Sequence, residues 1–425
     1  MNGTPEGLPR ADLLIAGSAE VATPLPGEPG RVRRIPGGVV AIAGGKIVGT
    51  GSREDVERAV DLRGARMVDA GGGLVVPGFV DCHTHLVFGG SRAREYAARV
   101  SGDPAALEAF EALEGPTGIL ASVEMTRAAS DEELFESASA RLDAMLAQGT
   151  TTAESKTGYG LEAAQELRML RLNRRLEAEH EVDVVSTLMA AHAFPPGTPP
   201  GTDAAGRWVD EIVEEIVPFA AAEGAEFNDV FCDAGYFGVD EARRILEAGR
   251  DAGLAPKIHA DQYTRLGASR LAAELQVVSA DHLNLTEDAE LEKLASAGVT
   301  GVLTPLIDFS VAHPKPVDAR RWLRAGLPIG LATDLCPGGP AVSMPLAMQF
   351  ACRVARLTPE QALWAATTGG ARALGREDRG ALEPGRLGDV VVVDVPSLEE
   401  FVYRLGHAPV RSVVRRGRIV AIGGG

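Results

Sequence analysis

Lysine is scarce in this chain of 425 residues, which contains only five lysines, so arginine carries nearly all of the positive charge. Acidic residues outnumber basic ones by 59 to 42, and the formal net charge is −17. Such an acidic chain disfavours nucleic acid or an anionic membrane surface as a partner, because like charges repel. It does not exclude a small anionic substrate, which local arginines can bind.

Long apolar runs are also missing. No stretch of about 18 uncharged apolar residues occurs, so no membrane-spanning helix is expected. The chain starts Met1-Asn2-Gly3-Thr4, without a basic segment leading into an apolar one, and no signal peptide is expected. We therefore expect a cytoplasmic protein.

Cysteine is rare as well, and none of the four cysteines forms a C-x-x-C pair. This pattern argues against a zinc ribbon and against a disulfide framework. We expect buried or site-lining thiols in a reducing compartment. The four residues are Cys82, Cys232, Cys336 and Cys352.

Both ends of the chain read as short strands and turns. A strand is expected over 12–16, and Gly44-Gly45 joins the runs 38–43 and 46–49 in a hairpin whose two-residue turn suits type I′. The Pro-, Gly- and Arg-rich segment 19–36 is expected to be a mobile loop. The last residues repeat the strand pattern at 389–394, 410–414 and 418–422, which predicts one small β-sandwich built from both termini.

The middle of the chain alternates apolar runs with amphipathic helical stretches such as 131–148 and 163–178. Eight strands alternating with helices predict an α/β fold with a TIM-like (β/α)₈ barrel. We expect a barrel over 74–378, flanked by sandwich segments 1–73 and 379–425, with extra helices between the first two strands. The expected barrel strands are 74–83, 150–156, 184–192, 227–233, 256–260, 277–282, 299–304 and 328–334.

Polar residues gather at the ends of these runs. His83 and His85 follow the first run with i, i+2 spacing, so both imidazoles point to one side of an extended backbone. Because catalytic groups collect where barrel strands end, the other strand-end residues are candidates too. They are Glu154, Lys156, His192, His259, Gln262, Asp281, His282 and Asp334. His180, His313 and His407 lie elsewhere, and we expect them to be surface or structural residues.

Four of these groups suit one metal ion, namely His83, His85, His259 and Asp334, because imidazole nitrogens and a carboxylate oxygen are ligands of zinc and iron. A metal lowers the pKa of its bound water from ~15.7 toward ~7. Asp334 can take the proton and return it to a leaving nitrogen. His282 can orient the water or stabilise oxyanion charge.

Each residue also has a purely structural interpretation. His192 could be a core histidine bonded to backbone, and His282 could be only a partner of Asp281. Asp334 could cap the following helix. Their joint occurrence at the ends of the predicted strands favours the functional interpretation.

The motifs resemble those of the amidohydrolase superfamily and, within it, of the imidazolonepropionase family. The resemblance covers nearly the whole chain, and its blocks are much more specific than His-x-His alone. They are residues 77–92, 154–161, 191–193, 259–262 and 279–283.

This resemblance implies hydrolytic ring opening of 4-imidazolone-5-propanoate to N-formimidoyl-L-glutamate in histidine degradation, and possible homodimers. It implies one Zn²⁺ or Fe³⁺ per chain, bound by His83, His85, His259 and Asp334. The catalytic group would comprise Asp334, His282 and Gln262. The substrate contacts would be Arg92, Tyr159, His192, Gln262, Cys336, Gly338 and Gly339.

Arg92 offers a two-pronged guanidinium to the substrate's propionate. The alternative for Arg92 is an ion pair with Glu95. The segment 336–339 departs from the family pattern, because Cys336 replaces an amide and Gly339 a hydroxyl. A thiol is a weak hydrogen-bond donor, so the loss of both groups predicts weaker or shifted substrate contacts.

Three other functions compete with this interpretation. Ring deaminases commonly carry a glutamate where this chain has Gln262. An amide cannot shuttle protons, which weighs against deamination, although Asp334 and His282 could share that task. A two-metal site with a carbamylated lysine is not expected, because the run 184–192 has no lysine and Lys156 lies one strand earlier. A non-catalytic barrel should have lost ligands, whereas all four are present here.

Overall fold

Eight parallel strands form the centre of the molecule in the computed structural model, which describes residues 7–422. They lie side by side in chain order, and a parallel bridge between Thr84 and Leu335 joins the last strand to the first. The (β/α)₈ barrel predicted from the sequence is confirmed. Its strands are β8 (Phe79–Asp81), β9 (Thr150–Lys156), β10 (Asp183–Ala191), β11 (Phe227–Cys232), β12 (Ala255–Ala260), β13 (Ser279–His282), β14 (Thr300–Leu303) and β15 (Ile329–Leu331).

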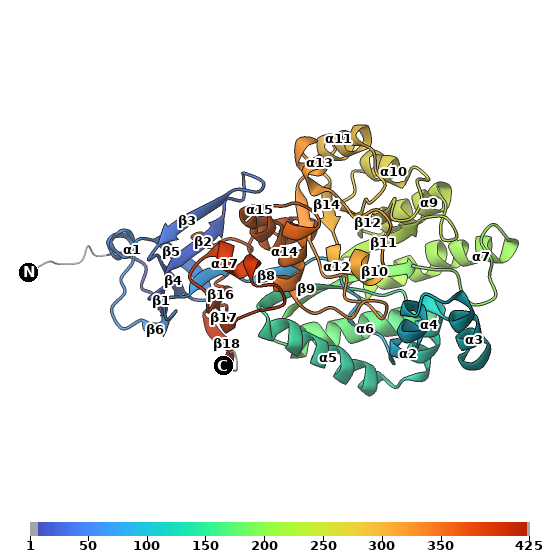
Figure 1. Cartoon of the computed structure of the whole chain (residues 1–425), viewed down its shortest axis with the longest axis horizontal. Helices are drawn as coiled ribbons and strands as arrows, with labels where there is room; N and C mark the ends of the chain where they lie inside the picture. The colour runs from blue at the N-terminus through green and yellow to red at the C-terminus, as the bar shows by residue number, and fades with distance from the viewer. Residues whose placement is uncertain (1–6, 423–425) are drawn as a thin grey trace, which may run out of the picture.

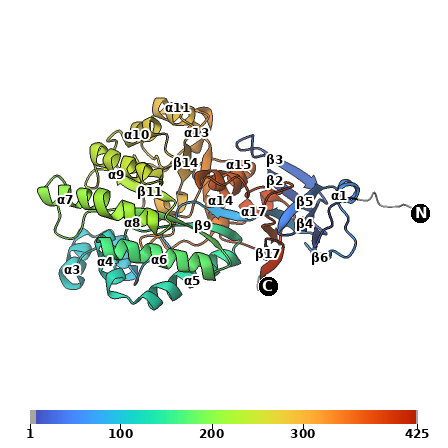
Figure 2. The ribbon, with the colours of Figure 1, turned by 180° about the vertical axis from the view of Figure 1, so that it is seen from behind.

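Helices surround this barrel, and Figure 2 shows α5, α6, α8 and α9 on its outer face. Their apolar faces pack on the strands, because an amphipathic helix is stabilised when its apolar face is buried against the core. The helices that follow the strands are α5 (Asp131–Ala147), α6 (Ala163–Glu179), α7 (Asp203–Glu211), α8 (Val217–Ala222), α9 (Val239–Asp251), α10 (Ala268–Leu275), α11 (Asp288–Ser296), α12 (Pro305–Ser310), α13 (Ala319–Arg324), α14 (Met344–Arg353), α15 (Pro359–Trp364) and α16 (Gly370–Ala373), with π-helical turns η1 (Ile212–Ile216) and η2 (Ala365–Gly369).

The expected extra helices between the first two barrel strands are present. They are α2 (Ala93–Val100), α3 (Pro104–Glu114) and α4 (Gly118–Ala128), which precede α5. In Figure 1 they lie together at one end of the molecule, opposite the sandwich.

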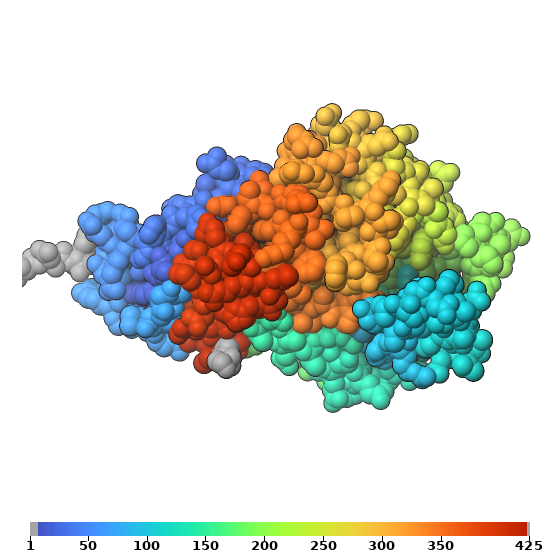
Figure 3. All heavy atoms as spheres, in the orientation of Figure 1, coloured from blue at the N-terminus to red at the C-terminus, as the bar shows by residue number. Residues whose placement is uncertain are grey.

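Two sheets form the β-sandwich, and strands from both ends of the chain contribute to it. One sheet has the order β5-β4-β1-β6, and the other β18-β17-β16-β7-β2-β3. In Figure 3, the C-terminal segment (red) lies between the N-terminal strands (blue) and the barrel on the face that is turned to the viewer. The elements are β1 (Leu13–Ala16), β2 (Glu20–Pro24), β3 (Val32–Pro36), β4 (Val39–Ala43), β5 (Lys46–Gly51), α1 (Arg53–Ala59), β6 (Arg66–Asp69), β7 (Leu74–Pro77), β16 (Val390–Val393), α17 (Leu398–Tyr403), β17 (Val410–Arg415) and β18 (Arg418–Ile422).

The hairpin expected at Gly44-Gly45 joins β4 to β5. Both glycines have positive φ, +56° and +78°, as a type I′ turn requires. Between the two sheets, a core of aliphatic side chains such as Ile15, Ile42 and Val392 holds the sandwich together.

The single strand expected over 74–83 is divided in two. β7 pairs with β16 and β2 in the sandwich, whereas β8 pairs with β9 in the barrel. Gly78 separates them, and a Cβ there would meet Thr151 Oγ1 at 2.3 Å, so only glycine permits this close approach. We propose that the chain has three parts, an N-terminal sandwich segment, the barrel and a C-terminal sandwich segment, with the first boundary at Gly78.

The prediction of a mobile loop over 19–36 was wrong, because β2 and β3 pair across this segment as an antiparallel hairpin. Arg34 forms ion pairs with Glu20 and with Glu399 of α17, so its charge stabilises a strand here. No helix in the described range 7–422 is long and apolar enough to cross a bilayer. The first six residues, on which the expectation of no signal peptide partly rests, lie outside that range.

Candidate active site

Five histidines meet at the carboxyl ends of the barrel strands, and all are nearly fully buried. The ring centroids of His83 and His259 are 4.5 Å apart, and those of His83 and His282 are 5.3 Å apart. His85 stacks on His192 at 4.9 Å. The strand-end histidines picked out in the sequence therefore form one cluster.

The Nδ1 atom of four of these rings faces a group that can only accept a hydrogen bond. His83 Nδ1 lies 2.6 Å from Asp281 and His259 Nδ1 lies 3.1 Å from Asp229. The backbone carbonyls of Thr157 and Gly158 lie 3.3 Å and 3.1 Å from Nδ1 of His85 and His192. In each neutral ring Nδ1 therefore carries the proton and Nε2 keeps a lone pair.

These lone pairs fit a metal ion. His83 Nε2 is buried without a hydrogen-bond partner, and it lies 3.6 Å from Asp334 Oδ1. Two overlapping groups of potential ligand atoms share His83, each with its atoms within 4.8 Å of one another. The groups are His83, His259 and His282, and His83, His85 and Asp334.

Burial favours the neutral form of the imidazoles. It holds the pKa of His83, His85 and His259 well below the usual range, with neighbouring histidines and Lys156 adding to the effect. It also lowers the pKa of His192 and of His282 to about 4. Neutral imidazoles are the form that binds metals.

Asp334 lies between two of these histidines. Its Oδ2 is 3.9 Å from His282 Nε2, while Oδ1 faces His83. Burial raises the pKa of this carboxyl to about 8. The backbone at Asp334 and His282 is left-handed, with φ of +52° and +73°, a strained conformation common at functional sites.

The structural alternatives left open by the sequence can now be compared with the contacts. Asp334 caps no helix, because the cap of the following helix, α14, is Ser343. The Asp281 carboxylate contacts His83 and Ser279, while His282 Nδ1 contacts Thr304 Oγ1 at 3.1 Å. The catalytic and metal-binding roles of these residues stay predictions.

Sequence reasoning named Glu154, Lys156 and Asp281 as strand-end candidates but missed the charged layer that they form beneath the histidines. Lys156 and Lys257 are fully buried inside the barrel with Glu154, Asp229 and Asp281. The carboxylates outweigh the effect of burial and raise the pKa of Lys156, so it is charged. A signal was present, because two of only five lysines fall inside predicted core strands. Lys156 lies two residues after Glu154, and Lys257 lies two residues before His259.

Lys156 also bears on the two-metal alternative. It lies on β9, the second barrel strand, and β10, which covers most of the run 184–192, is the third. The fourth strand, β11, reads Phe-Asn-Asp-Val-Phe-Cys and has no lysine either. The site without a carbamylated lysine stays a prediction.

Tyr159 and Arg92 border the histidine cluster. The buried ring of Tyr159 lies 5.3 Å from His85 and 5.1 Å from His192. Arg92 uses Nε and Nη2 to bind Glu95 at 2.8 Å and 2.7 Å, so the ion pair left as an alternative is present. Its remaining Nη1 points toward Gly338, where a Cβ would lie 3.3 Å away.

The loop Cys336–Gly339 forms a tight turn, with the Gly339 N–H donating to the Cys336 carbonyl at 3.1 Å. A Cβ at Gly339 would meet Ile307 Cδ1 at 2.7 Å and Ser310 Oγ at 3.4 Å. The α12 side chains therefore occupy the space of the missing hydroxyl. Burial raises the pKa of the Cys336 thiol to about 12, so the thiol stays protonated.

Gln262 is buried and follows the end of β12 by two residues. Its side-chain Nε2 donates to the Tyr263 hydroxyl at 3.4 Å, and its backbone carbonyl contacts His313 Nε2 at 2.9 Å. His313 also contacts the backbone carbonyl of Lys315, and its structural role stays a prediction. Cys82 and Cys232 are buried, and Cys336 and Cys352 are partly buried, all as free thiols.

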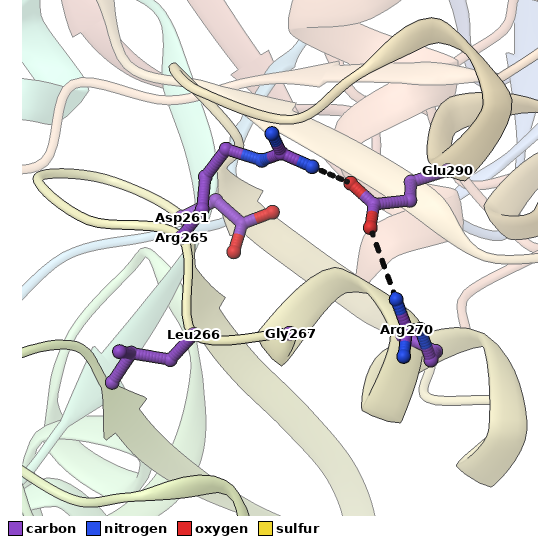
Figure 4. Close-up of a pocket in the computed structure, with 6 residues that line it drawn as sticks. All are labelled: Asp261, Arg265, Leu266, Gly267, Arg270 and Glu290. Atoms are coloured by element: carbon purple, nitrogen blue, oxygen red, sulfur yellow. Dashed lines mark hydrogen bonds and ion pairs between the residues drawn. The ribbon is translucent and has the colours of Figure 1, made fainter.

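Two hollows lie nearby. One hollow has a volume of about 290 Å³ and is lined by Arg265, Arg270 and Glu290, among others. Figure 4 shows that both arginines pair with Glu290. Asp261 also lines this hollow, outside the histidine cluster. A larger hollow of about 550 Å³, lined by Ala193 and Tyr236 among others, adjoins His192 along the chain.

Solved structures share this architecture. An adenosine deaminase from Xanthomonas campestris with bound zinc has a TM-score of 0.71 at 20% identity, covering 97% of this chain and 93% of that one. A guanine deaminase from C. acetobutylicum with bound guanine has a TM-score of 0.68 at 13% identity, covering 96% and 100%. The model of the amidohydrolase family matches residues 66–115 and 98–421, so fold and family define the class as amidohydrolase.

Curated relatives identify the family more narrowly. The imidazolonepropionase of Geobacillus kaustophilus is 42% identical over 391 residues, 91% of this chain and 90% of that protein. Those of Symbiobacterium thermophilum and Halobacterium salinarum are 43% and 44% identical, over 96% and 91% of this chain and 97% and 92% of theirs. The chain belongs to the imidazolonepropionase family.

Proposed function

We propose that this protein hydrolyses the ring of 4-imidazolone-5-propanoate to give N-formimidoyl-L-glutamate, a step of histidine degradation. Family membership supports the substrate, and one observation carries the chemistry. The imidazoles of four histidines are held through Nδ1, which leaves Nε2 of each ring available; they are His83, His85, His192 and His259. The buried Nε2 of His83 has no hydrogen-bond partner and faces the Asp334 carboxylate.

In this proposal His83, His85, His259 and Asp334 hold one zinc or iron ion per chain. The ion would supply Lewis acidity, which makes water acidic enough to lose a proton near neutral pH. Both metals accept this set of nitrogen and oxygen donors. A cytoplasmic location and a homodimer are part of the same proposal.

The protein's own groups then direct the reaction. Asp334 takes the proton of the attacking water on a carboxylate oxygen and returns it to the ring nitrogen as the C–N bond breaks. His282, whose Nε2 faces Asp334 Oδ2, stabilises charge on the ring oxygen. Tyr159 and His192 form the wall that holds the flat ring.

Arg92 binds the propionate in this proposal. Because Glu95 already occupies Nε and Nη2, the substrate carboxylate would be bound through Nη1, beside Gly338. Gln262 contributes a neutral amide near the ring. An amide cannot carry protons, which favours ring hydrolysis over deamination.

The test is hydrolysis of freshly generated 4-imidazolone-5-propanoate, followed by the loss of its ultraviolet absorbance, with metal content measured on the same sample. We expect fast loss that a chelator abolishes and that one equivalent of zinc or iron restores. A metal-loaded protein without this activity would contradict the substrate while leaving the amidohydrolase class intact.

A further inference from the structure

The buried ammonium group of Lys156 lies between three carboxylates beneath the histidine cluster. Lys156 Nζ is 2.6 Å from Asp229 Oδ2, 3.0 Å from Glu154 Oε2 and 3.5 Å from Asp281 Oδ2. All four side chains are fully buried. A buried charge of this kind persists only when partners compensate its lost hydration.

Two of these carboxylates have a second role. Asp281 Oδ2 contacts Nδ1 of His83 and Asp229 Oδ1 contacts Nδ1 of His259, so each orients one proposed metal ligand. Carboxylates that bind the distal nitrogen of a ligating histidine fix its tautomer and its orientation. Lys156 is thus one contact away from two neighbouring histidines of the cluster.

The two aspartates need the lysine between them. Asp229, His259 and Asp281 have side-chain atoms within 4.8 Å of one another, and like charges at that distance repel strongly in a buried site. Without the ammonium between them, this repulsion is less well offset, and the two carboxylates are pushed apart. A displaced carboxylate no longer holds the Nδ1–H of its histidine in place.

Lys257 is buried to the same extent, and of the three carboxylates that pair with Lys156 it pairs only with Glu154. Its Nζ contacts Glu154 Oε1 at 2.8 Å and the carbonyls of Cys82 and Ala373 at 3.3 Å and 3.4 Å. Neither Asp229 nor Asp281 is among its ion-pair partners in the described residues. It therefore offers a matched control for the loss of a buried ammonium.

We propose that Lys156 is a positioning residue that holds His83 and His259 in their metal-binding orientation through Asp281 and Asp229. The proposal rests on the metal site of the proposed function. It assigns Lys156 no contact with the substrate, so its effect passes through metal affinity.

The test compares K156M with K257M in the full-length protein. Zinc affinity is measured by competition with a chromophoric chelator, and thermal unfolding of the metal-free proteins records the cost of losing each charge. We expect zinc affinity to fall about 10- to 100-fold in K156M, the range typical of lost partners of metal-binding histidines. K257M should bind zinc like the wild type. Saturating zinc should restore much of kcat in K156M.

A second readout follows the histidines directly. In zinc-loaded protein labelled with ¹⁵N-histidine, the Nδ1–H signals of His83 and His259 should both shift in K156M and stay in place in K257M. Equal loss of affinity in both variants, or no loss in K156M, would overturn the proposal.

If K156M does not fold, Asp229→Asn and Asp281→Asn provide the measurement instead. Each should weaken zinc binding and displace the signal of its own histidine, and unchanged affinity in both would overturn the proposal. These readouts involve no substrate. The zinc affinities and histidine signals would therefore follow the expectation even if the substrate assignment were wrong. If the role of Lys156 were wrong, they would depart from the expectation while hydrolysis by the wild type stayed the same.

Discussion

At the scale of single residues, Asp334 combines two contacts that the proposed reaction requires. One carboxylate oxygen faces His83 among the proposed metal ligands, and the other faces His282. The sequence could nominate this aspartate because it follows the last predicted strand. It could not reveal which histidine each oxygen faces, because that depends on His83, just after β8, and on His282 at the end of β13.

Asp334→Asn should retain the fold and lose about 10²- to 10⁴-fold in kcat, because an amide cannot take and return the proton. The measurement is steady-state hydrolysis of the proposed substrate, with thermal unfolding as the check on folding. Near-normal turnover in a metal-loaded variant would contradict the proton-transfer role.

Arg92→Ala should raise KM about 10- to 100-fold for a carboxylate-bearing substrate, since a charge-assisted hydrogen bond to the propionate is lost. Arg99→Ala is the matched control, because Arg99 also binds Glu95 at 2.7 Å but is half-exposed. The control should leave KM unchanged. Equal KM effects of the two substitutions would mean that Arg92 acts only by holding Glu95.

At the scale of elements, the strands and helices followed from the apolar pattern, whereas their partners did not. The run 74–83 looks like one strand in the sequence, but Gly78 divides it between two sheets. The segment 19–36 looked like a loop because proline, glycine and arginine dominate it. Its strands exist because Arg34 and the edge of β7 provide partners that are distant in sequence.

Two glycines in helical segments should respond oppositely to alanine. Gly206 lies within α7, where an added Cβ has no neighbour within 4 Å, so Gly206→Ala should stabilise the protein by about 0.5–1 kcal/mol. At Gly370, the first residue of α16, the Cβ would lie 2.3 Å from the Val80 carbonyl. Gly370→Ala should therefore destabilise it by about 1–3 kcal/mol through overpacking.

Denaturant unfolding at a fixed metal concentration measures both effects. The two variants need to be compared with the wild type under the same conditions, because a ligand of the folded state changes apparent stability. A destabilised Gly206→Ala, or an unaffected Gly370→Ala, would contradict the packing of α7 or of α16 described above.

At the scale of the whole molecule, the joint between sandwich and barrel contains buried charge. The Asp389 carbonyl accepts the Gly78 N–H between the two sheets, and its carboxylate accepts the Arg416 N–H at 2.9 Å. Burial raises the pKa of this carboxyl to about 6. A raised carboxyl pKa adds stability below the unfolded pKa, and this contribution is lost as pH rises through about 6.

Asp389→Asn should flatten that part of the pH dependence. Between pH 4 and 7 the free energy of unfolding of the wild type should fall, relative to the variant, by up to about 3 kcal/mol, which corresponds to the raised pKa. Urea unfolding across this pH range is the measurement. Parallel pH profiles for the two proteins would show that Asp389 ionises normally in the joint.

The sequence by itself determined the eight barrel strands, the sandwich from both termini and the residues of the histidine cluster. These features depend on apolar periodicity and on polar groups at strand ends, both of which are local along the chain. Only the tertiary structure decided which nitrogen of each imidazole is free, that Arg92 is bound to Glu95, and that Lys156 connects two histidine–aspartate pairs. Those facts depend on side chains from strands far apart in the sequence, whose distances are set only when the barrel closes.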